Sequence, residues 1–366
     1  MPTAVDLARS FKANGWRVVV CDPFGWHLAR TSRCVDTTLR VPAPAHSPDA
    51  FLEALLSAVA EWDVTLVVPV SEETMHVAAL RDRLPKHVTV FGGPQSDTLR
   101  LHSKRRFAHI ADDIGLAAPQ TVPIGSDAAT SLLAAHDCVA KPEFSCSGRG
   151  VQFLARGSNV PVALPDGYVL QRKIEGDEFS AMAIARHGAI TDCVVYRALI
   201  TSGSVAVAFE RVEMPDIERW VRQFVEATAH NGFIAFDFIV DATATAYAIE
   251  CNPRATSGLH FFNTHRLATA ITDGTSAGLR PEHKLQEFWS AWTHWCGSVG
   301  DRPARRAAGQ AIRSARDVSW RRDDPWVFLL ATFSTWPIIW RAMRHGQSFS
   351  QVLPRDIEWR VDDDQR

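Results

Sequence analysis

The segment FIAFDFIVDATATAYAIECNPR, residues 233–254, constrains the fold of this chain more than any other stretch. Its two apolar runs are separated by Thr243 and Ala244, which predicts two β-strands joined by a turn. In a hairpin centred there, Asp237 lies opposite Glu250. Opposed residues of an antiparallel pair have Cβ atoms roughly 5 Å apart, where two negative charges repel each other. The predicted hairpin therefore needs a positive counter-charge.

Two sources of that counter-charge are visible in the sequence. Side chains alternate along a strand, so Asn252 and Arg254 share a face with Glu250. Two carboxylates and an amide oxygen suit Mg²⁺, which binds few protein groups and keeps positions for phosphate oxygens and water. Alternatively, Arg254 neutralises the carboxylates and the arrangement is structural. The hairpin alone leaves both interpretations open.

The composition narrows the class of protein. The chain has 366 residues, of which 46% are hydrophobic, enough for two or three domains with buried cores. Lysine and arginine total 39 against 41 acidic residues, so we expect neither nucleic acid nor an anionic membrane as a partner. Seven cysteines without CxxC or Cys/His spacing predict reduced thiols and no structural metal. The first residues are unlike a signal peptide, which favours a cytoplasmic protein that acts on small molecules.

Residues 1–98 alternate helical and strand patterns, which predicts a Rossmann-like α/β domain. Continuous apolar runs at 17–21 and 65–70 are typical of parallel strands that helices cover on both faces. No GxGxxG motif follows the first strand, which disfavours a dehydrogenase. The second strand leads into Ser71, Glu72 and Glu73.

Those three residues have two interpretations. They lie at the carboxyl end of a strand, where α/β sheets bind ligands. They also make an ordinary helix start, and we favour this capping interpretation.

A basic helix expected at 99–114 carries Lys104 and opens a second region. Beyond it, a strand ends in Lys141 and leads into the small-residue loop SCSGRG at 145–150. Serine and glycine let backbone amides approach phosphate oxygens, and the lysine adds positive charge. The loop lacks the GxxxxGK[ST] order of a P-loop, so a glycine-rich hairpin turn without a ligand remains an alternative.

The next segment, QRKIEGDEF at 171–179, has a strand-turn-strand pattern. One interpretation is a linker between two lobes, whose backbone groups and Ile174 hold a nucleotide base while Glu178 binds ribose hydroxyls. The alternative is an exposed hairpin on which Glu178 is a surface charge.

Taken in order, these sites resemble the ATP-grasp superfamily of ATP-dependent carboxylate ligases. Lys104, then Lys141 before SCSGRG, then QRKIEGDEF and the hairpin ending in ECNPR match the family's linear sequence of nucleotide and metal sites. The resemblance implies a two-lobed ATP-grasp domain at 99–275, with lobes at about 99–168 and 169–275. The preceding region resembles the pre-ATP-grasp domain of biotin carboxylase and carbamoyl phosphate synthetase.

The resemblance assigns a role to each position. It implies that the ATP phosphates are bound by Lys104, Lys141, Ser145, Ser147, Gly148, Arg149 and Gly150. It implies that the adenosine is held by Gln171, Arg172, Ile174 and Glu178, although the family often has glutamate at the first of these positions. Mg²⁺ is assigned to Asp237, Glu250 and Asn252. Arg254 is expected to stabilise negative charge that develops during catalysis.

The implied activity is ATP-dependent ligation. A small-molecule carboxylate, in the first place an amino acid, is activated as an acyl phosphate, and an amine then displaces the phosphate to form an amide. A catalytically silent ATP-binding scaffold and a carboxylase that works through carboxyphosphate are the alternatives. The sequence does not identify the substrates, and it does not determine the oligomeric state, for which a homodimer is one option.

Candidate substrate residues are Arg197, Ser257, Gly258 and His260. Arg197 has the fork geometry to bind a carboxylate, but a surface arginine on a strand is the favoured alternative. His260 has the chemistry to take a proton from an amine, but a structural histidine is favoured.

Residues 276–366 change to a helical, tryptophan-rich pattern. Trp289, Trp292 and Trp295 recur at helical spacing, which predicts a stripe that faces the core. The alternative is that this extension docks a partner protein or lines the pocket for the acceptor substrate. The apolar run 325–340 is shorter than the roughly 20 residues of a membrane-spanning helix, so no stable membrane insertion is expected. The acidic, polar end of the chain is predicted to fray.

Overall fold

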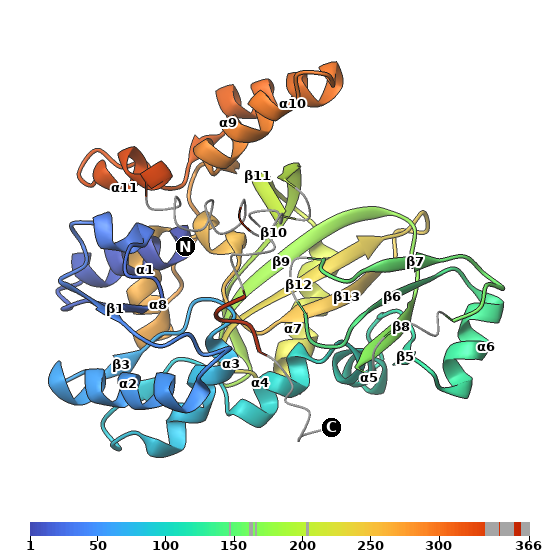
Figure 1. Ribbon diagram of the computed structural model, residues 1–366, viewed down its shortest axis with the longest axis horizontal. Helices are drawn as coiled ribbons and strands as arrows, with labels where there is room; N and C mark the ends of the chain where they lie inside the picture. Colours follow the sequence, from blue (N-terminus) through green and yellow to red (C-terminus); the bar gives the residue numbers. More distant parts are fainter. Residues whose placement is uncertain are drawn as a thin grey trace.

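The computed structural model describes residues 1–145, 148–160, 164, 167–202, 205–333, 344 and 355–359. Within them the chain forms two parallel strand pairs, a four-stranded sheet and a seven-stranded sheet. The strand pairs and the four-stranded sheet lie on opposite sides of the seven-stranded sheet (Figure 1). The predicted mixture of α/β layers is confirmed.

The amino-terminal region is built on the two parallel pairs, β1 with β2 and β3 with β4. Its elements are α1 Pro2–Ala13, β1 Val19–Asp22, η1 Leu28–Thr31, β2 Thr37–Arg40, α2 Pro48–Glu61, β3 Leu66–Val67, α3 Thr74–Val77, η2 Ala78–Arg83 and β4 Thr89–Val90. The strand expected at 65–70 shrinks to two residues because Pro69 has no N–H group with which to extend the ladder. The Rossmann-like prediction is thus confirmed for parallel pairing, whereas the described strands do not form one continuous sheet.

The basic helix expected at 99–114 is broken at Ser103. α4 covers Gln95–His102 and α5 covers Lys104–Asp113. The backbone of Ser103 is extended, and its hydroxyl accepts a backbone N–H from the first turn of α5 at 3.1 Å. Serine favours such a cap over a helix interior, because its side chain competes for backbone hydrogen bonds. The break places Lys104 at the start of α5, where it is 2% exposed.

The four-stranded sheet has the order β5-β8-β6-β7. Its elements are β5 Thr121–Pro123, α6 Asp127–Ala135, β6 Cys138–Pro142, β7 Gln152–Leu154 and β8 Tyr168–Arg172. Leu132 and Leu133 of α6 pack in one cluster with Leu170 of β8. β8 pairs with both β5 and β6, so it belongs to the sheet of the first lobe. The boundary that we expected at residue 168 would separate β8 from this sheet.

The seven-stranded sheet has the order β13-β12-β9-β10-β11-β14-β15. The elements of its main part are β9 Asp177–Arg186, β10 Ala189–Ser202, β11 Val205–Val212, α7 Pro215–Ala227, β12 Gly232–Val240, β13 Ala246–Asn252, η3 Ser257–Phe261, η4 Thr264–Arg266 and α8 Leu267–Thr272. β8 and β9 are consecutive in the chain but belong to different sheets. Residues 173–176 therefore link the two lobes, as one interpretation of QRKIEGDEF predicted.

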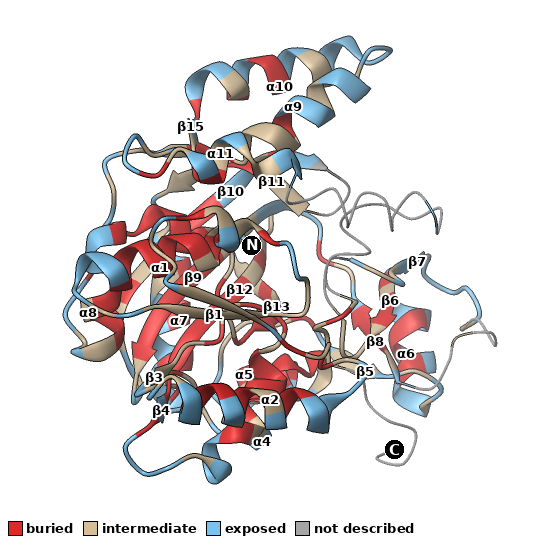
Figure 2. Cartoon of the chain, turned by 60° about the vertical axis from the view of Figure 1, so that its left-hand side comes forward, coloured by how far each residue is buried: buried red, intermediate tan, exposed pale blue. Residues whose placement is uncertain are grey.

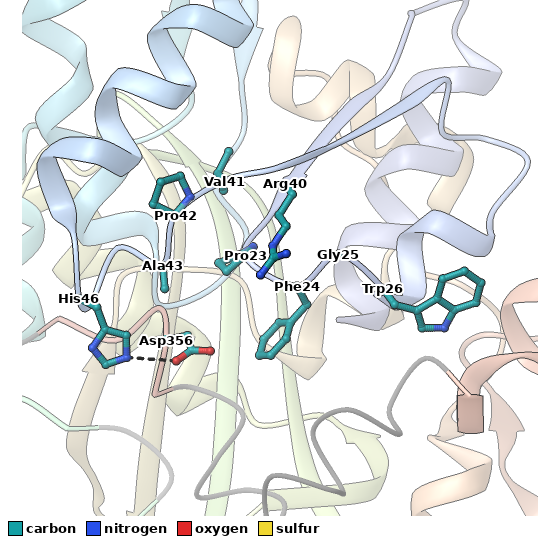
Figure 3. Close-up of a pocket in the computed structure, with 10 residues that line it drawn as sticks. All are labelled: Pro23, Phe24, Gly25, Trp26, Arg40, Val41, Pro42, Ala43, His46 and Asp356. Atoms are coloured by element: carbon teal, nitrogen blue, oxygen red, sulfur yellow. Dashed lines mark hydrogen bonds and ion pairs between the residues drawn. The ribbon is translucent and has the colours of Figure 1, made fainter.

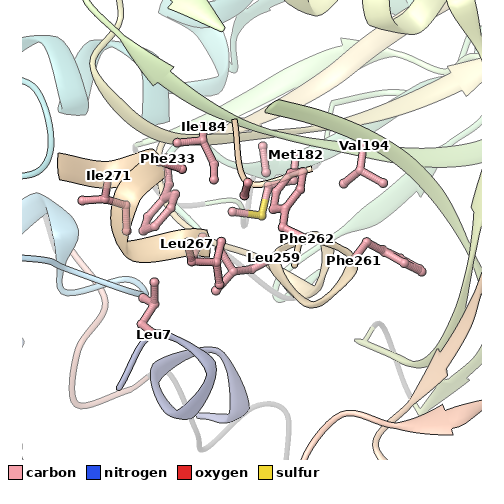
Figure 4. Close-up of a cluster of buried hydrophobic side chains, with 14 of the residues drawn as sticks. Leu7, Met182, Ile184, Val194, Phe233, Leu259, Phe261, Phe262, Leu267 and Ile271 are labelled. Atoms are coloured by element: carbon pink, nitrogen blue, oxygen red, sulfur yellow. The ribbon is translucent and has the colours of Figure 1, made fainter. Parts of the chain in front are cut away.

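Alternating side chains give the large sheet two apolar faces. Met182 and Ile184 of β9 join Leu259 and Phe261 in a cluster that α1 and α8 also enter (Figure 4). The residues between them face α5 and α7, around Trp220. Burial on both faces explains why the strands are continuous apolar runs. The contact of α1 with η3 ties the amino-terminal region to this sheet.

The carboxyl-terminal extension is helical in part. Its elements are β14 Lys284–Gln286, α9 Phe288–Gly297, α10 Arg302–Ser314, β15 Arg316–Asp317 and α11 Trp326–Leu329. β14 and β15 join the edge of the large sheet, with Gln286 in register with Ala208, which corrects the expectation of a purely helical extension. Residues 334–340 of the apolar run lie outside the described residues. No helix in the described ranges is long and apolar enough to cross a membrane.

The tryptophans of α9 do not form the expected core-facing stripe. Ala291 is the buried residue of this helix, whereas Trp292 is 41% exposed. Trp289 donates its indole N–H to a backbone carbonyl of α11 at 2.9 Å, and Trp295 lies 4.4 Å from the Arg305 guanidinium. α9 and α10 pack on each other and project from the sheet (Figure 2), so most of their surface has no core to face.

Candidate active site

The β12–β13 hairpin brings the two predicted carboxylates together. Asp237 pairs in register with Glu250, and Ala235 pairs with Asn252. The turn holds this register: the carboxylate of Asp241 accepts the backbone N–H groups of two later turn residues at 2.9 and 3.0 Å. The predicted opposition of the carboxylates is confirmed.

Asp237 sits in surroundings that disfavour its charge. Ser180 donates a hydrogen bond to one carboxylate oxygen at 2.7 Å, and Asn252 Nδ2 donates to the other at 3.3 Å. Burial nevertheless raises the pKa of Asp237 to about 6, and the negative charge of Glu250 contributes to the rise. The two hydrogen-bond donors therefore do not compensate the cost of a negative charge on Asp237, and a bound cation would compensate it.

Two buried lysines approach the carboxylates from the other lobe and from α5. Lys104 Nζ lies 3.6 Å from Glu250 Oε2 and donates to the Ser145 carbonyl at 2.8 Å. Lys141 Nζ donates to the carbonyl of Ile249, the neighbour of Glu250 on β13, at 3.2 Å. Burial lowers the pKa of Lys141 to about 8, although the charge of Glu250 opposes the shift. The structure therefore groups both lysines with the carboxylate pair.

The glycine-rich loop begins beside these lysines. Ser145 accepts hydrogen bonds from Lys104 through both its carbonyl and its hydroxyl. Gly148 and Gly150 have positive φ angles of 63° and 71°. A Cβ at Gly150 would lie 2.5 Å from Tyr168 Oη, so this position requires glycine. Ser147 lies outside the described residues.

Arg149, at the centre of the same loop, pairs with the carboxylate of Glu358, close to the carboxyl terminus. No local pattern around Arg149 indicates this partner, which is 209 residues away along the chain.

The linker between the lobes holds the predicted adenosine residues in unlike environments. Gln171 is 3% exposed, and its amide donates to Thr121 Oγ1 at 2.9 Å and to the Ile249 carbonyl at 3.3 Å. Ile174 is 8% exposed, whereas Arg172 and Glu178 are exposed. Because β8 and β9 lie in different sheets, they do not form a hairpin, although the exposure of Glu178 agrees with the alternative that it is a surface charge.

Arg254 is fixed by a carboxylate of the amino-terminal region. Its Nε lies 2.5 Å from Glu72 Oε1, and another guanidinium nitrogen donates to Asn252 Oδ1 at 3.1 Å. Burial alone would raise the pKa of Glu72, but the positive charge of Arg254 lowers it. His102 Nε2 lies 3.9 Å from Glu72 Oε2, and burial lowers the pKa of this histidine to about 4.

Glu72 is the site residue that sequence reasoning missed. The neighbouring Glu73 is the residue before α3, but its side chain makes no cap hydrogen bond to that helix; its Oε1 instead accepts the backbone N–H groups of Val70 and Ser71 at 2.8 and 2.9 Å, in the segment that precedes the helix. Glu72 points instead to Arg254. Its place just after the apolar run 65–70 marked Glu72 as a possible ligand contact, but nothing in the local sequence indicated its partner Arg254.

The candidate substrate residues are not gathered around the carboxylates. The Arg197 side chain is 52% exposed and pairs with Glu210 at 3.0 Å, which matches the surface alternative. His260 is buried, with Nδ1 2.7 Å from Asp6 Oδ2 of α1, which matches the structural alternative. Gly258 packs on β9, where a Cβ would lie 2.6 Å from Met182 Cβ. Ser257 begins the same short helix, η3.

The donor set at the hairpin fits a hard cation that keeps open positions. The described residues contain no group of three or more His, Cys, Asp or Glu side chains that could hold a metal. Two carboxylates and one amide oxygen remain, which is the sparse oxygen set that Mg²⁺ accepts when phosphate oxygens complete its shell. The raised pKa of Asp237, which burial and the charge of Glu250 cause, supports this fit.

Comparison with known proteins agrees with this arrangement. Residues 103–258 match the family model of the ATP-grasp domain. No curated protein matches the chain.

Among solved structures, N5-carboxyaminoimidazole synthetase from Staphylococcus aureus is 11% identical with a TM-score of 0.63, and the match covers 82% of this chain and 84% of that one. L-amino acid ligase from Bacillus licheniformis is 16% identical with a TM-score of 0.58, covering 76% of each chain. Pyruvate carboxylase from Rhizobium etli is 14% identical with a TM-score of 0.60; the match covers 76% of this chain but 29% of the carboxylase. These likenesses establish the fold.

Proposed function

We propose that this chain, whose residues 103–258 match the ATP-grasp domain, is an ATP-dependent ligase that joins a small-molecule carboxylate to an amine. One observation carries the proposal. Asp237 and Glu250 are opposed on one hairpin, with two lysines of other elements beside them. Opposite charges are thus concentrated where a metal and a triphosphate would share a site.

Each part of the site has a role in this proposal. Asp237, Glu250 and Asn252 would hold Mg²⁺, which when bound neutralises phosphate charge and orients the triphosphate. Lys104, Lys141 and the loop 145–150 would bind the phosphates. Gln171 at the end of β8 and Ile174 of the linker would contact the base, with Arg172 and Glu178 on either side of the linker.

Positively charged side chains of the chain would stabilise the negative charge that develops during ligation. Transfer of the γ-phosphate to the carboxylate places negative charge on the departing ADP, and this step depends on positioning and neutralisation more than on covalent help. Attack of the amine on the acyl phosphate then places negative charge on the carbonyl oxygen of the tetrahedral intermediate, and loss of phosphate leaves the amide. Arg254 is the cation that Glu72 and Asn252 hold in a fixed orientation. A preorganised arginine stabilises developing charge without reorganising during the reaction. Arg254 and Lys141 are therefore the proposed catalytic residues.

The domain arrangement follows from the same assignment. We propose a pre-ATP-grasp domain at 1–98 and an ATP-grasp domain at 99–275, whose lobes meet at the linker after β8. The carboxyl-terminal region at 276–366 extends the larger sheet. An amino acid is the proposed carboxylate, the amine is left unspecified, and a homodimer is the proposed assembly.

The proposal is tested by ADP release. The protein is incubated with Mg²⁺, ATP and pairs of amino acids, and ADP is measured together with the mass of the product. We expect ADP release that requires both members of one pair and equals the amide formed. With ¹⁸O in the substrate carboxylate, one label should appear in inorganic phosphate, because the acyl phosphate transfers that oxygen.

Two results would contradict the ligase assignment. ADP release that requires bicarbonate and no amine would indicate a carboxylase. Nucleotide binding without ADP release across every pair would indicate a silent scaffold.

A further inference from the structure

A second cavity lies outside the ATP site, where β1 and β2 end. Its volume is about 590 Å³, within the range of roughly 300–1,000 Å³ typical of small-molecule sites. It lies at the carboxyl ends of two parallel strands, the position at which open α/β sheets bind ligands. Figure 3 shows the lining residues, which come from residues 23–26, from residues 40–43 and 46, and from Asp356 near the carboxyl terminus.

The lining combines opposite charges with an apolar wall. Arg40 ends β2, and within the described part of the chain it makes no ion pair. Asp356 contributes a carboxylate, one oxygen of which lies 3.2 Å from His46 Nε2. The apolar part of the lining is made by Pro23, Phe24 and Pro42 (Figure 3). A guanidinium, a carboxylate and an apolar wall match the carboxylate, the ammonium group and the side chain of an apolar α-amino acid.

The carboxyl-terminal segment 355–359 closes one side of this cavity, although the sequence predicted that the chain end frays. The Asp356 carbonyl accepts the backbone N–H of Ala45 at 3.1 Å. The Glu358 carbonyl lies 3.2 Å from His76 Nε2, and the Trp359 ring packs on His76 with centroids 4.9 Å apart. These contacts fix the segment on the amino-terminal region.

The same segment reaches the glycine-rich loop of the proposed ATP site. Glu358, two residues from Asp356, pairs with Arg149. The segment therefore contacts the cavity with one carboxylate and the loop with another. While Glu358 holds Arg149, the positive charge of that arginine is compensated within the protein and is withheld from a phosphate.

We propose that this cavity binds a free apolar α-amino acid, with its carboxylate on Arg40, its ammonium group on Asp356 and its side chain against Phe24. Binding stabilises the docked segment, which keeps Glu358 on Arg149 and weakens the affinity for ATP. The binding step does not depend on the proposed function. The coupling step rests on it, because it takes the loop 145–150 to be the phosphate loop.

The binding step is tested by calorimetry on the full chain without nucleotide. The probes are L-phenylalanine and L-leucine, with phenethylamine and 3-phenylpropanoate as controls that lack the carboxylate or the ammonium group. We expect saturable binding of an amino acid and at least tenfold weaker binding of both controls, since each loses one charge-assisted contact.

Variants assign the binding to this cavity. Arg40→Gln and Asp356→Asn should each weaken amino-acid binding about tenfold or more. Arg33→Gln, which changes an exposed arginine of the same region, should leave binding unchanged. Absence of saturable binding for both amino acids, or equal binding by wild type and by both cavity variants, would overturn the site. Folding of each variant is checked by its circular dichroism and by its affinity for an ATP analogue.

The coupling step is tested by the affinity for ATP with and without the bound amino acid. We expect a several-fold weaker affinity in its presence, and by reciprocity the same factor for the amino acid in the presence of ATP. Glu358→Gln should abolish this factor while the amino acid still binds. Binding without any change in ATP affinity would overturn the coupling and leave the site standing. Mass spectrometry measures whether the bound amino acid is consumed. Consumption indicates a substrate at this site, and an unchanged amount indicates an effector.

Discussion

Two buried carboxylates of the active site are in opposite electrostatic situations. Asp237 lies opposite Glu250, and its pKa rises to about 6 because burial and a like charge disfavour ionisation. Glu72 lies against Arg254, whose charge overcomes the effect of burial and lowers its pKa. One carboxylate lacks a sufficient counter-charge within the protein, whereas the other has a complete one.

This difference separates the two roles. A like-charged pair is destabilising by itself and is retained where a ligand supplies the missing charge. An oppositely charged pair with close geometry needs no ligand and holds a side chain in place. On this basis we propose that Asp237 and Glu250 bind the metal and the nucleotide, and that Glu72 positions Arg254.

The largest effect is expected from Glu250→Gln. Loss of this charge should reduce kcat for ADP formation by about 10³-fold or more, because the metal loses a carboxylate ligand and phosphate charge is no longer neutralised. Circular dichroism should show an intact fold. Glu213→Gln, at an exposed position, is the matched control and should retain wild-type turnover. Unchanged turnover in Glu250→Gln would remove the metal assignment.

Replacing Glu72 should have a smaller effect of a different kind. Glu72→Gln should lower kcat about 10- to 100-fold, since Arg254 loses its buried partner and its fixed orientation. Mg²⁺-dependent nucleotide binding should stay close to wild type, because Glu72 touches neither proposed ligand. Glu73→Gln keeps the side-chain oxygen that accepts the N–H groups of Val70 and Ser71, and it serves as the control. A variant of Glu72 that lost nucleotide binding together with kcat would show that the two carboxylates share one role.

Asp237→Asn should separate stability from function. It removes the repulsion with Glu250, so without Mg²⁺ the free energy of unfolding at pH 7 should rise by on the order of 1–3 kcal/mol, as expected for a pKa raised by about two units. ADP formation should be lost. Thermal denaturation with and without Mg²⁺ measures the difference, with Asp82→Asn as an exposed control. A destabilised variant would mean that the pair is structural.

The smallest effect concerns His102, which neighbours the Glu72–Arg254 pair. Burial lowers the pKa of this histidine from 6.5 to about 4, so the folded state holds it neutral. Its contribution to stability is fully present above pH 6.5 and is lost as the pH falls toward 4, because the unfolded chain then binds the additional proton.

Unfolding measured between pH 7 and 4.5 tests this direction. His102→Gln should lose less stability on acidification than wild type, by about 1–3 kcal/mol. His109→Gln changes a histidine whose side chain is 76% exposed and should follow the wild-type curve. An identical slope for wild type and His102→Gln would show that this histidine is charged in the folded protein.

The features that the sequence predicted correctly depend on local pattern. Alternation and a turn at Thr243 determined which residues oppose each other in the hairpin, and apolar runs indicated strands buried on both faces. The linker was recognised because its order between the loop and the hairpin matched the family. Local rules sufficed wherever neighbours in the sequence are also neighbours in space.

The features that were missed depend on distant partners. Glu72 meets Arg254 from another region of the chain, and Glu358 meets Arg149 across the whole ATP-grasp domain. In neither case does the sequence around one residue of the pair indicate its partner. The tryptophans of α9 were misread for a related reason, because helical spacing shows which residues share a face but not whether a core covers that face.

The central claim is that Asp237 and Glu250 form a site completed by a cation and a nucleotide. Calorimetric titration with a non-hydrolysable ATP analogue, in Mg²⁺ and in excess EDTA, tests it on the wild type and on Glu250→Gln. The account predicts that Mg²⁺ strengthens binding at least tenfold in the wild type and that Glu250→Gln loses this dependence. Equal affinity with Mg²⁺ and with EDTA in the wild type would contradict it.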